Sequence, residues 1–429
     1  MSDPVTAVPD ELRTAPARPA RALGLLRRTD FRSVYLAVAA SELGDALHYI
    51  AIMWFAFDTG GPLGVVAVRL ADSVPALVFG LHGGLAADRW DRRRMMIGAD
   101  LARAAVLVPI AVAGLAGHLP LAALVVAAFL LETATSYFAP AYGALLPALV
   151  DRANVQQANA LVQGTVQALS VGGWALAAAL VAVLPISTFF AVNAASFAVS
   201  AALIARVRVS RARAAHVEPP RLHEGFAALR PRPALAVGVV VLGVAVTVSS
   251  GTWIGGVPSL VRDALHHGAG GFSIVMVGYA LGSIVSGILL ARTPIRRKAL
   301  ASQLAWTLYL PGYGLMALAG SLWIAVAGAF AAALGQSSAL VLLNSAAQEE
   351  VPDSLLGRVV GLISLTHRGA HATGLLLVSP LFAFVAPRAV FVGAALALPL
   401  VGLTGAALSL GVAKGRPGRG PFGRRPRYP

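Results

Sequence analysis

Charged side chains inside apolar stretches are the residues of this sequence best suited to chemistry. Glu42 and Asp45 share one such stretch and are three residues apart, so on a helix they lie on the same face. The other candidates lie in three further stretches: Asp72, Glu132, Arg368 and His371. An ionised side chain at the centre of a bilayer costs at least about 2.5 kcal/mol, so such groups usually carry a function. Carboxylates and histidines there can carry protons.

No enzyme motif competes with this interpretation. The chain has no cysteine, which excludes thiolate catalysis and Cys-ligated zinc. It also lacks the phosphate-binding loop Gly-x-x-x-x-Gly-Lys-Ser/Thr, the HExxH of metalloproteases and the GxSxG of hydrolases. We therefore predict a protein that is not an enzyme and that uses no cofactor and no metal.

The composition places these charged groups in a membrane. Of the 429 residues, 57% are hydrophobic and only 12% are charged, and the mean hydropathy is +0.75. Soluble domains carry about a quarter charged residues. A helix needs about 20 predominantly apolar residues to cross a bilayer, so a chain of this length fits about a dozen crossings. We predict an all-α membrane protein.

Twelve apolar segments are predicted to be transmembrane helices in two six-helix bundles. They are residues 33–57, 62–87, 95–117, 119–146, 159–183, 186–206, 234–259, 270–291, 299–319, 321–344, 359–384 and 388–411. The predicted domains are a leader (1–30), a first bundle (31–207), a linker (208–233), a second bundle (234–412) and a basic tail (413–429). Aligning Gly84 with Gly287 puts "GLAADRWDRRR" over "GILLARTPIRR", with Ala291 in the place of Asp88, which supports a duplicated unit.

The lysine and arginine residues predict the orientation. If both termini are cytoplasmic, the cytoplasmic segments hold 29 of the 34 basic residues, as the positive-inside rule requires. This distribution accounts for the net charge of +15 without a nucleic-acid partner, because the basic residues are dispersed over one membrane face. The expected location is the cell membrane, which the chain crosses many times, and membrane lipids are expected partners.

The stretch "GGLAADRWDRRR", Gly83 to Arg94, resembles the loop motif between helices two and three of the major facilitator superfamily. The matching positions are Gly84, Asp88, Arg89, Arg92 and Arg93, and Asp91 replaces the second motif glycine. Residues 41–45 ("SELGD"), 58–64 ("DTGGPLG"), 138–150 ("FAPAYGALLPALV") and 349–359 ("EEVPDSLLGRV") are similar to the drug-exporter branch that includes macrolide and siderophore efflux proteins. Two exporter features are missing: Gly173 stands where a proline is expected in helix five, and helix four has no arginine.

The resemblance implies a conformational latch in the first half only. Asp88 would meet the positive end of the helix that starts at 357–359 whenever the cytoplasmic side is closed, a contact worth up to about 2 kcal/mol. Gly84 would allow the helices to approach closely. The motif arginines would pair with acids such as Asp91 and Asp100 or with anionic lipid headgroups.

The resemblance also implies a central cavity between the two halves, which would bring charges of both signs together. Our hypothesis is that Glu132 and one of Glu42 and Asp45 carry a coupling proton. Arg368 would be a counter-charge that substrate or proton displaces. Asp45 could instead be a helix-packing residue that neighbouring hydroxyl groups satisfy.

Two further candidates also have structural alternatives. Asp72 is three residues from Arg69, so the two could form an ion pair, with the arginine snorkelling to the outer interface. His371 is the better relay candidate among the histidines, but a satisfied structural histidine is the competing interpretation.

The expected function is secondary active transport. The chain would export amphipathic small molecules, such as drugs, antibiotics or siderophores, by rocker-switch alternating access with proton antiport, and would act as a monomer. The alternatives are an importer or symporter of the same superfamily, or a protein that does not pump, such as a lipid scramblase. Proton-dependent accumulation against a gradient distinguishes a pump from the last of these.

Overall fold

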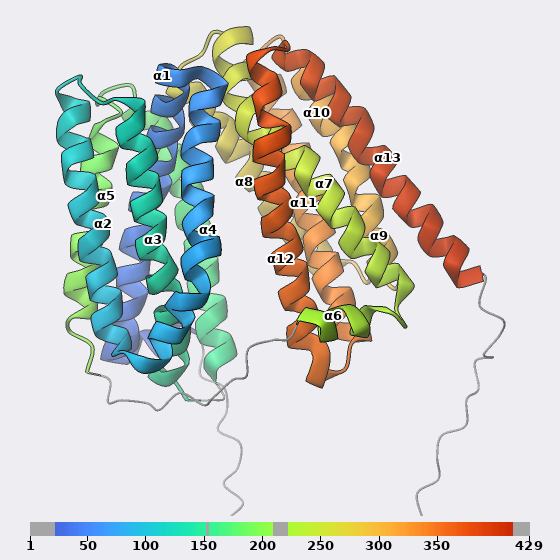
Figure 1. Cartoon of the computed structure of the whole chain (residues 1–429), viewed down its shortest axis with the longest axis horizontal. Coiled ribbons are helices and arrows are strands. Elements are labelled where there is room, and N and C mark those ends of the chain that lie inside the picture. Colours follow the sequence, from blue (N-terminus) through green and yellow to red (C-terminus); the bar gives the residue numbers. More distant parts are fainter. Residues whose placement is uncertain (1–21, 152–153, 209–221, 415–429) are drawn as a thin grey trace, which may run out of the picture.

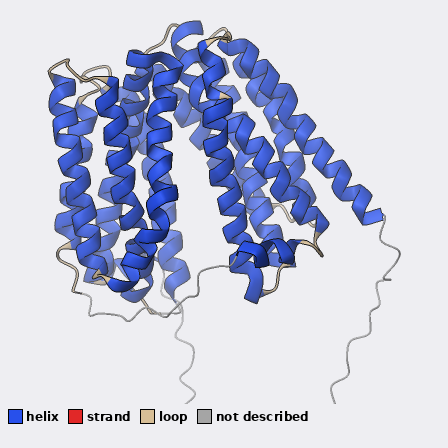
Figure 2. Ribbon diagram, in the orientation of Figure 1, coloured by secondary structure: helices blue, strands red, loops and turns tan. Residues whose placement is uncertain are grey.

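The chain folds into helices throughout the part that its computed structural model describes, residues 22–151, 154–208 and 222–414. Figure 2 shows that these helices run roughly side by side, and no strand occurs in the described ranges. Seven helices are long and apolar enough to cross a membrane. The prediction of an all-α membrane protein is therefore confirmed.

The helices form two groups. The first comprises α1 (Thr29–Arg89), α2 (Arg92–Leu115), α3 (Leu121–Leu145), α4 (Val155–Leu180) and α5 (Thr188–Ile204). The second comprises α7 (Pro233–Ser259), α8 (Ala269–Arg292), α9 (Lys298–Leu304), α10 (Tyr309–Ala317), α11 (Leu322–Glu350), α12 (Asp353–Leu377) and α13 (Pro387–Lys414), and the short α6 (Leu222–Leu229) precedes it. In Figure 1 the groups meet at one end, where α4 contacts α8 and α1 contacts α7, and diverge towards the end that carries α6.

Helix α1 contains two of the predicted crossings, 33–57 and 62–87. The two arms are joined at Gly61, whose φ of 58° and ψ of −152° are non-helical. Glycine adopts this backbone conformation because it has no Cβ, and Pro62 disfavours helical angles at the residue before it. A Cβ on Gly64 would lie 2.2 Å from the carbonyl oxygen of Ala56. The chain therefore reverses within one residue.

Several predicted boundaries are wrong, because helices continue beyond their apolar parts. α4 begins at Val155 instead of 159, α11 reaches Glu350 instead of 344, and α12 begins at Asp353 instead of 359. Gln and Glu residues in the end turns of α4 and α11 support a helix but lower the local hydropathy, and Asp353 and Arg358 lower it at the start of α12. The linker predicted over 208–233 contains a helix, α6.

Some predicted crossings are short or interrupted. Helix α5 has 17 residues, which at 1.5 Å per residue is slightly less than the roughly 30 Å of the hydrocarbon core. The segment predicted over 299–319 is α9 and α10 joined by a 3-10 turn, Ala305–Leu308. Hydropathy identified the apolar segment 299–319 but does not report the break in its backbone.

Gly83, not Gly84, lets α1 approach α3 closely. A Cβ on Gly83 would lie 2.1 Å from the carbonyl oxygen of Ser136, whereas a Cβ on Gly84 would meet nothing within 4 Å. Adjacent helix positions differ by about 100° in direction, so only one of the pair can face a given neighbour. In this conformation Gly84 has no close neighbour, and its role in the latch stays a prediction.

This difference provides a matched pair of substitutions. Gly83→Ala should lower stability by about 1–3 kcal/mol, because α1 and α3 must move apart to accept the methyl group. Gly84→Ala should be neutral or slightly stabilising, since alanine favours a helix by up to about 1 kcal/mol over glycine. The apparent unfolding temperature in detergent measures both. Equal temperatures for the two variants would contradict the packing described for Gly83.

The second half repeats this close approach between α8 and α11. A Cβ on Gly282 would lie 2.2 Å from the carbonyl oxygen of Phe330, and the hydroxyl groups of Ser286 and Ser338 are 2.8 Å apart. Small residues at a helix contact allow backbones to approach closely in a membrane. Gly287, which the alignment placed over Gly84, likewise faces open space.

Candidate functional site

The loop between α1 and α2 holds the predicted latch motif. α1 ends at Arg89, which is exposed, and α2 begins at Arg92. Asp91 is the N-cap of α2, and its carboxylate accepts a hydrogen bond of 2.8 Å from the backbone N–H of Arg94. Aspartate is among the best N-cap residues because its oxygen satisfies a free backbone donor. The departure from the motif glycine therefore has a structural role.

Two motif arginines bind carbonyl groups instead of acids. Arg92 donates to the carbonyl oxygen of Ala144 at 3.1 Å, near the end of α3, and also to that of Ala87 at 3.3 Å. Arg93 donates to Ile204, at 3.2 Å, and to Ala205 at the end of α5. The last carbonyls of a helix lack intrahelical donors, so arginines there satisfy them. The predicted pairing with Asp91 or Asp100 is wrong.

The latch itself stays a prediction, because the side chain of Asp88 lies outside the described residues. The expected partner needs a correction: α12 begins at Asp353, so residues 357–359 lie in its second turn. The favourable helix-end field is confined to the first turn. Near Arg358, α12 lies against α6, where a Cβ on Gly225 would be 3.0 Å from the Arg358 carbonyl oxygen.

Three of the predicted site residues share one cavity. A cavity of about 240 Å³ is lined by side chains from both arms of α1 and from α2, α3 and α5. Its charged and polar lining residues are Asp45, His48, Tyr49, Arg69, Asp72, Arg103, Glu132, Thr135 and Asn193. We expected Asp45 and Glu132 around a cavity between the halves, but this one lies among helices of the first half.

The carboxylates in this cavity differ in their partners. Asp72 forms an ion pair with Arg69 at 2.5 Å. Asp45 accepts a hydrogen bond of 3.0 Å from the side-chain amide of Asn193 on α5. Glu132 has neither a hydrogen bond nor an ion pair with any residue in the described ranges. Glu132 is therefore the carboxylate most available for exchange.

Arg69 lines the internal cavity together with its partner, Asp72. The expected ion pair is confirmed, and snorkelling of Arg69 to the outer interface stays a prediction. Glu42 does not line the cavity: it accepts a hydrogen bond from the hydroxyl of Ser170 on α4. Glu42 and Asp45, which were predicted to share one helix face, thus bind different helices: Glu42 contacts α4 and Asp45 contacts α5.

Sequence reasoning missed a buried ion pair beside this cavity. Arg103 and Asp100, both on α2, are 2.5 Å apart and at most 5% exposed. Ser200 donates a hydrogen bond of 2.7 Å to the same carboxylate. The guanidinium lies 4.5 Å from the ring centre of Phe138 and 4.3 Å from that of Phe197. The signal was an aspartate and an arginine three residues apart within an apolar stretch.

The other half contributes charge from α12. Arg368 is exposed and makes no hydrogen bond or ion pair within the described ranges, and His371 is partly buried. Arg368 lies within electrostatic range of Glu132, and His371 within range of Arg69. Asp72 and Arg69 of the cavity act on Glu132 as well, so Arg368 is one of several charges around this carboxylate.

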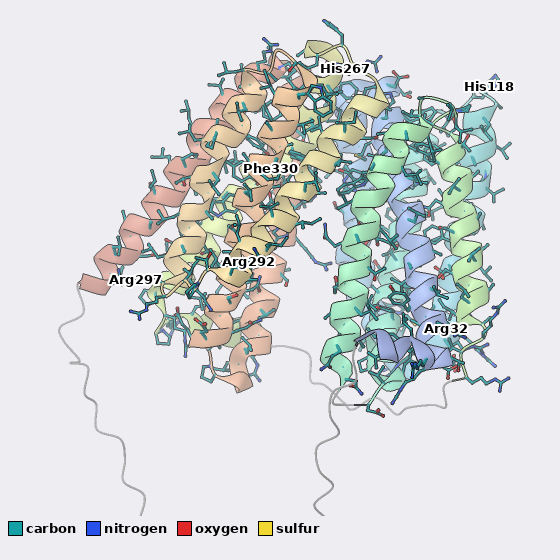
Figure 3. All side chains as sticks on the ribbon, turned by 180° about the vertical axis from the view of Figure 1, so that it is seen from behind. Arg32, His118, His267, Arg292, Arg297 and Phe330 are labelled. Carbon is teal, nitrogen blue, oxygen red and sulfur yellow. The ribbon has the colours of Figure 1, made fainter. Side chains whose placement is uncertain are left out.

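The two halves are fastened together at the end away from α6. Asp58 and Arg262 form an ion pair across the halves, and the Arg262 guanidinium lies 5.7 Å from the ring centre of Phe57. The ring centres of Trp54 and Phe272, one from each half, are 6.4 Å apart. Figure 3 places His118 and His267 at this fastened end and Arg32 and Arg297 at the opposite end.

This helical arrangement is that of major facilitator transporters. The nucleoside transporter NupG superimposes with a TM-score of 0.68 at 12% identity, over 88% of this chain and 98% of that one. A bacterial homologue of the human lysosomal transporter Spinster, in an inward-facing and unoccupied conformation, superimposes with a TM-score of 0.59 at 14% identity. That match covers 94% of this chain and 100% of the other.

The chain belongs to the major facilitator family described as transmembrane secretion effector, whose profile matches residues 20–416. Macrolide efflux protein A of Streptococcus pyogenes is 24% identical over 270 residues. That alignment spans 61% of this chain and 65% of the relative's length. The expected superfamily is confirmed, and its members are membrane transporters, not enzymes.

Proposed function

We propose that this protein exports amphipathic small molecules from the cell in exchange for protons. In this proposal it crosses the membrane with twelve helical segments in two halves, 31–207 and 234–412. The leader, the linker and the tail are all cytoplasmic. The placement of 29 of the 34 basic residues supports the orientation. The likeness to a macrolide efflux protein supports export and an amphipathic substrate.

The single observation that carries the proposal is that Glu132 is the cavity carboxylate without a hydrogen bond or ion pair in the described ranges. The other carboxylates of the cavity already have polar partners, so Glu132 can alternate between a proton and a substrate group. Arg368 supplies a positive charge that stabilises the ionised glutamate once its proton has left. Substrate or a proton would then displace this interaction, which couples the two ligands.

Alternating access provides the movement. The halves are joined at the Asp58–Arg262 end and diverge at the other end, which is the cytoplasmic end in the proposed orientation. Substrate would enter from that side as the proton leaves. The halves would then rock, the Asp58–Arg262 contacts would separate, and Asp88 would approach the first turn of α12 as a latch. One of Glu42 and Asp45 would assist as a second proton carrier.

Everted membrane vesicles from a host without its own efflux pumps test this function. A macrolide, a cationic dye and a neutral dye should be offered, with an acid vesicle interior. We expect proton-dependent accumulation of at least one probe, which a protonophore abolishes. Accumulation that survives the protonophore would contradict proton coupling. Uptake only in right-side-out vesicles would indicate an importer, and movement of lipid probes alone a scramblase.

The ion pair between Asp58 and Arg262 gives a prediction about the conformation of the two halves. Asp58→Asn should increase the population that is open on the outer side by at most about fivefold, since an exposed ion pair contributes up to about 1 kcal/mol. The chain has no cysteine, so spin labels on cysteines introduced at His118 and His267 report this opening as a distance distribution.

Asp151→Asn is the matched control for that measurement. Asp151 forms an equally exposed ion pair with Arg28, but both residues belong to the first half. The control should leave the distances between the labels unchanged. If Asp58→Asn has no more effect than Asp151→Asn, the Asp58–Arg262 pair does not hold the halves together.

A further inference from the structure

A second cavity lies at the α6 end of the second half, away from the proposed transport site. It has a volume of about 650 Å³ and lies between the end of α8, the start of α9 and α11. Arg292, Arg296 and Lys298 contribute positive charge to its lining, and Leu290, Ile295 and Val341 contribute apolar surface. It is therefore a cavity with a cationic side and an apolar side.

The arginines of this cavity are not used by the protein itself. Lys298 forms an ion pair with Glu349, which leaves two uncompensated positive charges. Arg292 and Arg296 are exposed and make no hydrogen bond or ion pair with any residue that the structure describes. An arginine fork presents paired donors that match a phosphate group.

The corresponding loop of the first half shows why this matters. There, Arg92 and Arg93 bind the carbonyl ends of helices, so their donors are occupied. The positive-inside rule accounts for basic residues at both loops. In the second loop, by contrast, Arg292 and Arg296 border a cavity and bind no helix end among the described residues. These two arginines therefore have donors that face the cavity lining instead of a neighbouring helix.

An apolar strip continues from the cavity along α8. Leu281, Ile288 and Leu289 are each about half exposed, and Val341 of α11 borders both the cavity and this surface. Both helices are apolar enough to cross the membrane. The occupant must therefore satisfy two positive charges at the helix ends and an apolar surface within the membrane.

We propose that this cavity binds an anionic phospholipid. Its phosphate would lie between Arg292 and Arg296, and an acyl chain would follow the exposed face of α8. In the proposed orientation the lipid belongs to the cytoplasmic leaflet. Basic pockets between helices at this level are suited to such headgroups. A free phosphate would satisfy the arginines but would leave the apolar strip uncovered.

Native mass spectrometry of the purified full-length protein tests the site. Dioleoyl phosphatidylglycerol and dioleoyl phosphatidylcholine are added separately, and the bound lipid is counted. The variant Arg292→Gln/Arg296→Gln should lose about tenfold or more in phosphatidylglycerol affinity, because two charge-assisted hydrogen-bonding sites are removed. Its phosphatidylcholine binding should not change.

The control variant Arg27→Gln/Arg32→Gln removes the same charge from the same end of the molecule. These two arginines are exposed, and neither side chain makes a hydrogen bond or ion pair in the described ranges. This control should bind phosphatidylglycerol as the wild type does. Equal loss in both double variants would show a general charge effect and overturn the proposal, as would no loss in either.

Two further experiments distinguish a bound lipid from a bound soluble phosphate. Excess glycerol phosphate should not displace phosphatidylglycerol if the acyl chain contributes, and full displacement would indicate an anion site and overturn the lipid proposal. A phosphatidylglycerol with a photoreactive acyl chain should crosslink near Ile288 and Leu289. Crosslinks confined to other helices would contradict the assigned path.

Discussion

Vesicles that contain the Glu132→Gln variant are expected to lose all proton-driven accumulation of substrate, down to the level of vesicles without the protein. Glutamine keeps the size and polarity of the side chain but cannot exchange a proton. Glu132 is the cavity carboxylate without a hydrogen bond or ion pair in the described part of the chain, so no neighbour compensates for its loss. Energy-independent equilibration of substrate should persist, because the fold is unchanged.

Three further variants show whether the loss of accumulation is specific to Glu132. Asp151→Asn removes a carboxylate far from the cavity and should leave accumulation unchanged. Glu42→Gln and Asp45→Asn should differ from one another, since only one of them is proposed to assist Glu132. Full proton-coupled accumulation in Glu132→Gln, Glu42→Gln and Asp45→Asn alike would refute the assignment of proton carriers.

The largest effect on stability is expected at Arg103. Arg103→Met leaves Asp100, which is 0% exposed, without its ionic partner. Breaking a buried ion pair on one side costs about 3–5 kcal/mol, because the remaining charge is buried and uncompensated. The contacts of the guanidinium with Phe138 and Phe197 are lost as well. Expression and the unfolding temperature should both fall strongly.

Two comparisons identify the cause of that fall. Asp100→Asn/Arg103→Met removes both charges and should recover most of the lost stability, because an apolar replacement of a whole buried pair is often tolerated. Arg28→Gln breaks an exposed pair and should cost less than about 1 kcal/mol. An Arg103→Met variant as stable as the wild type would show that Asp100 is not ionised in the fold.

Most of the helical architecture could be predicted, since hydropathy reports directly on burial in lipid. The details that were missed depend on the backbone. The start of α12 at Asp353 lies in a polar turn, which hydropathy places outside the helix. The chain reverses at Gly61 between two predicted helices, and this reversal needs only one residue with a positive φ, so no loop separates them. The choice between Gly83 and Gly84 depends on helix rotation, which the motif does not specify.

The candidate site could be predicted in part. Charged residues in apolar segments singled out Asp45, Asp72 and Glu132, which line one cavity, and their roles stay predictions. Their position inside the first half could not be predicted, because it depends on which side of α1 faces α2 and α5. Asp100 was assigned to the loop arginines by proximity in sequence, although Arg103 on the same helix face is its partner.

Proton release on substrate binding is the most direct measurement of the central claim, that Glu132 exchanges a proton for substrate. Purified protein in weakly buffered detergent solution is mixed with a macrolide that the vesicle assay has identified as a substrate, and a pH indicator records the protons released. The account predicts that Glu132→Gln releases about one proton fewer per bound molecule than the wild type. Identical release from both proteins, with substrate bound to both, would contradict it.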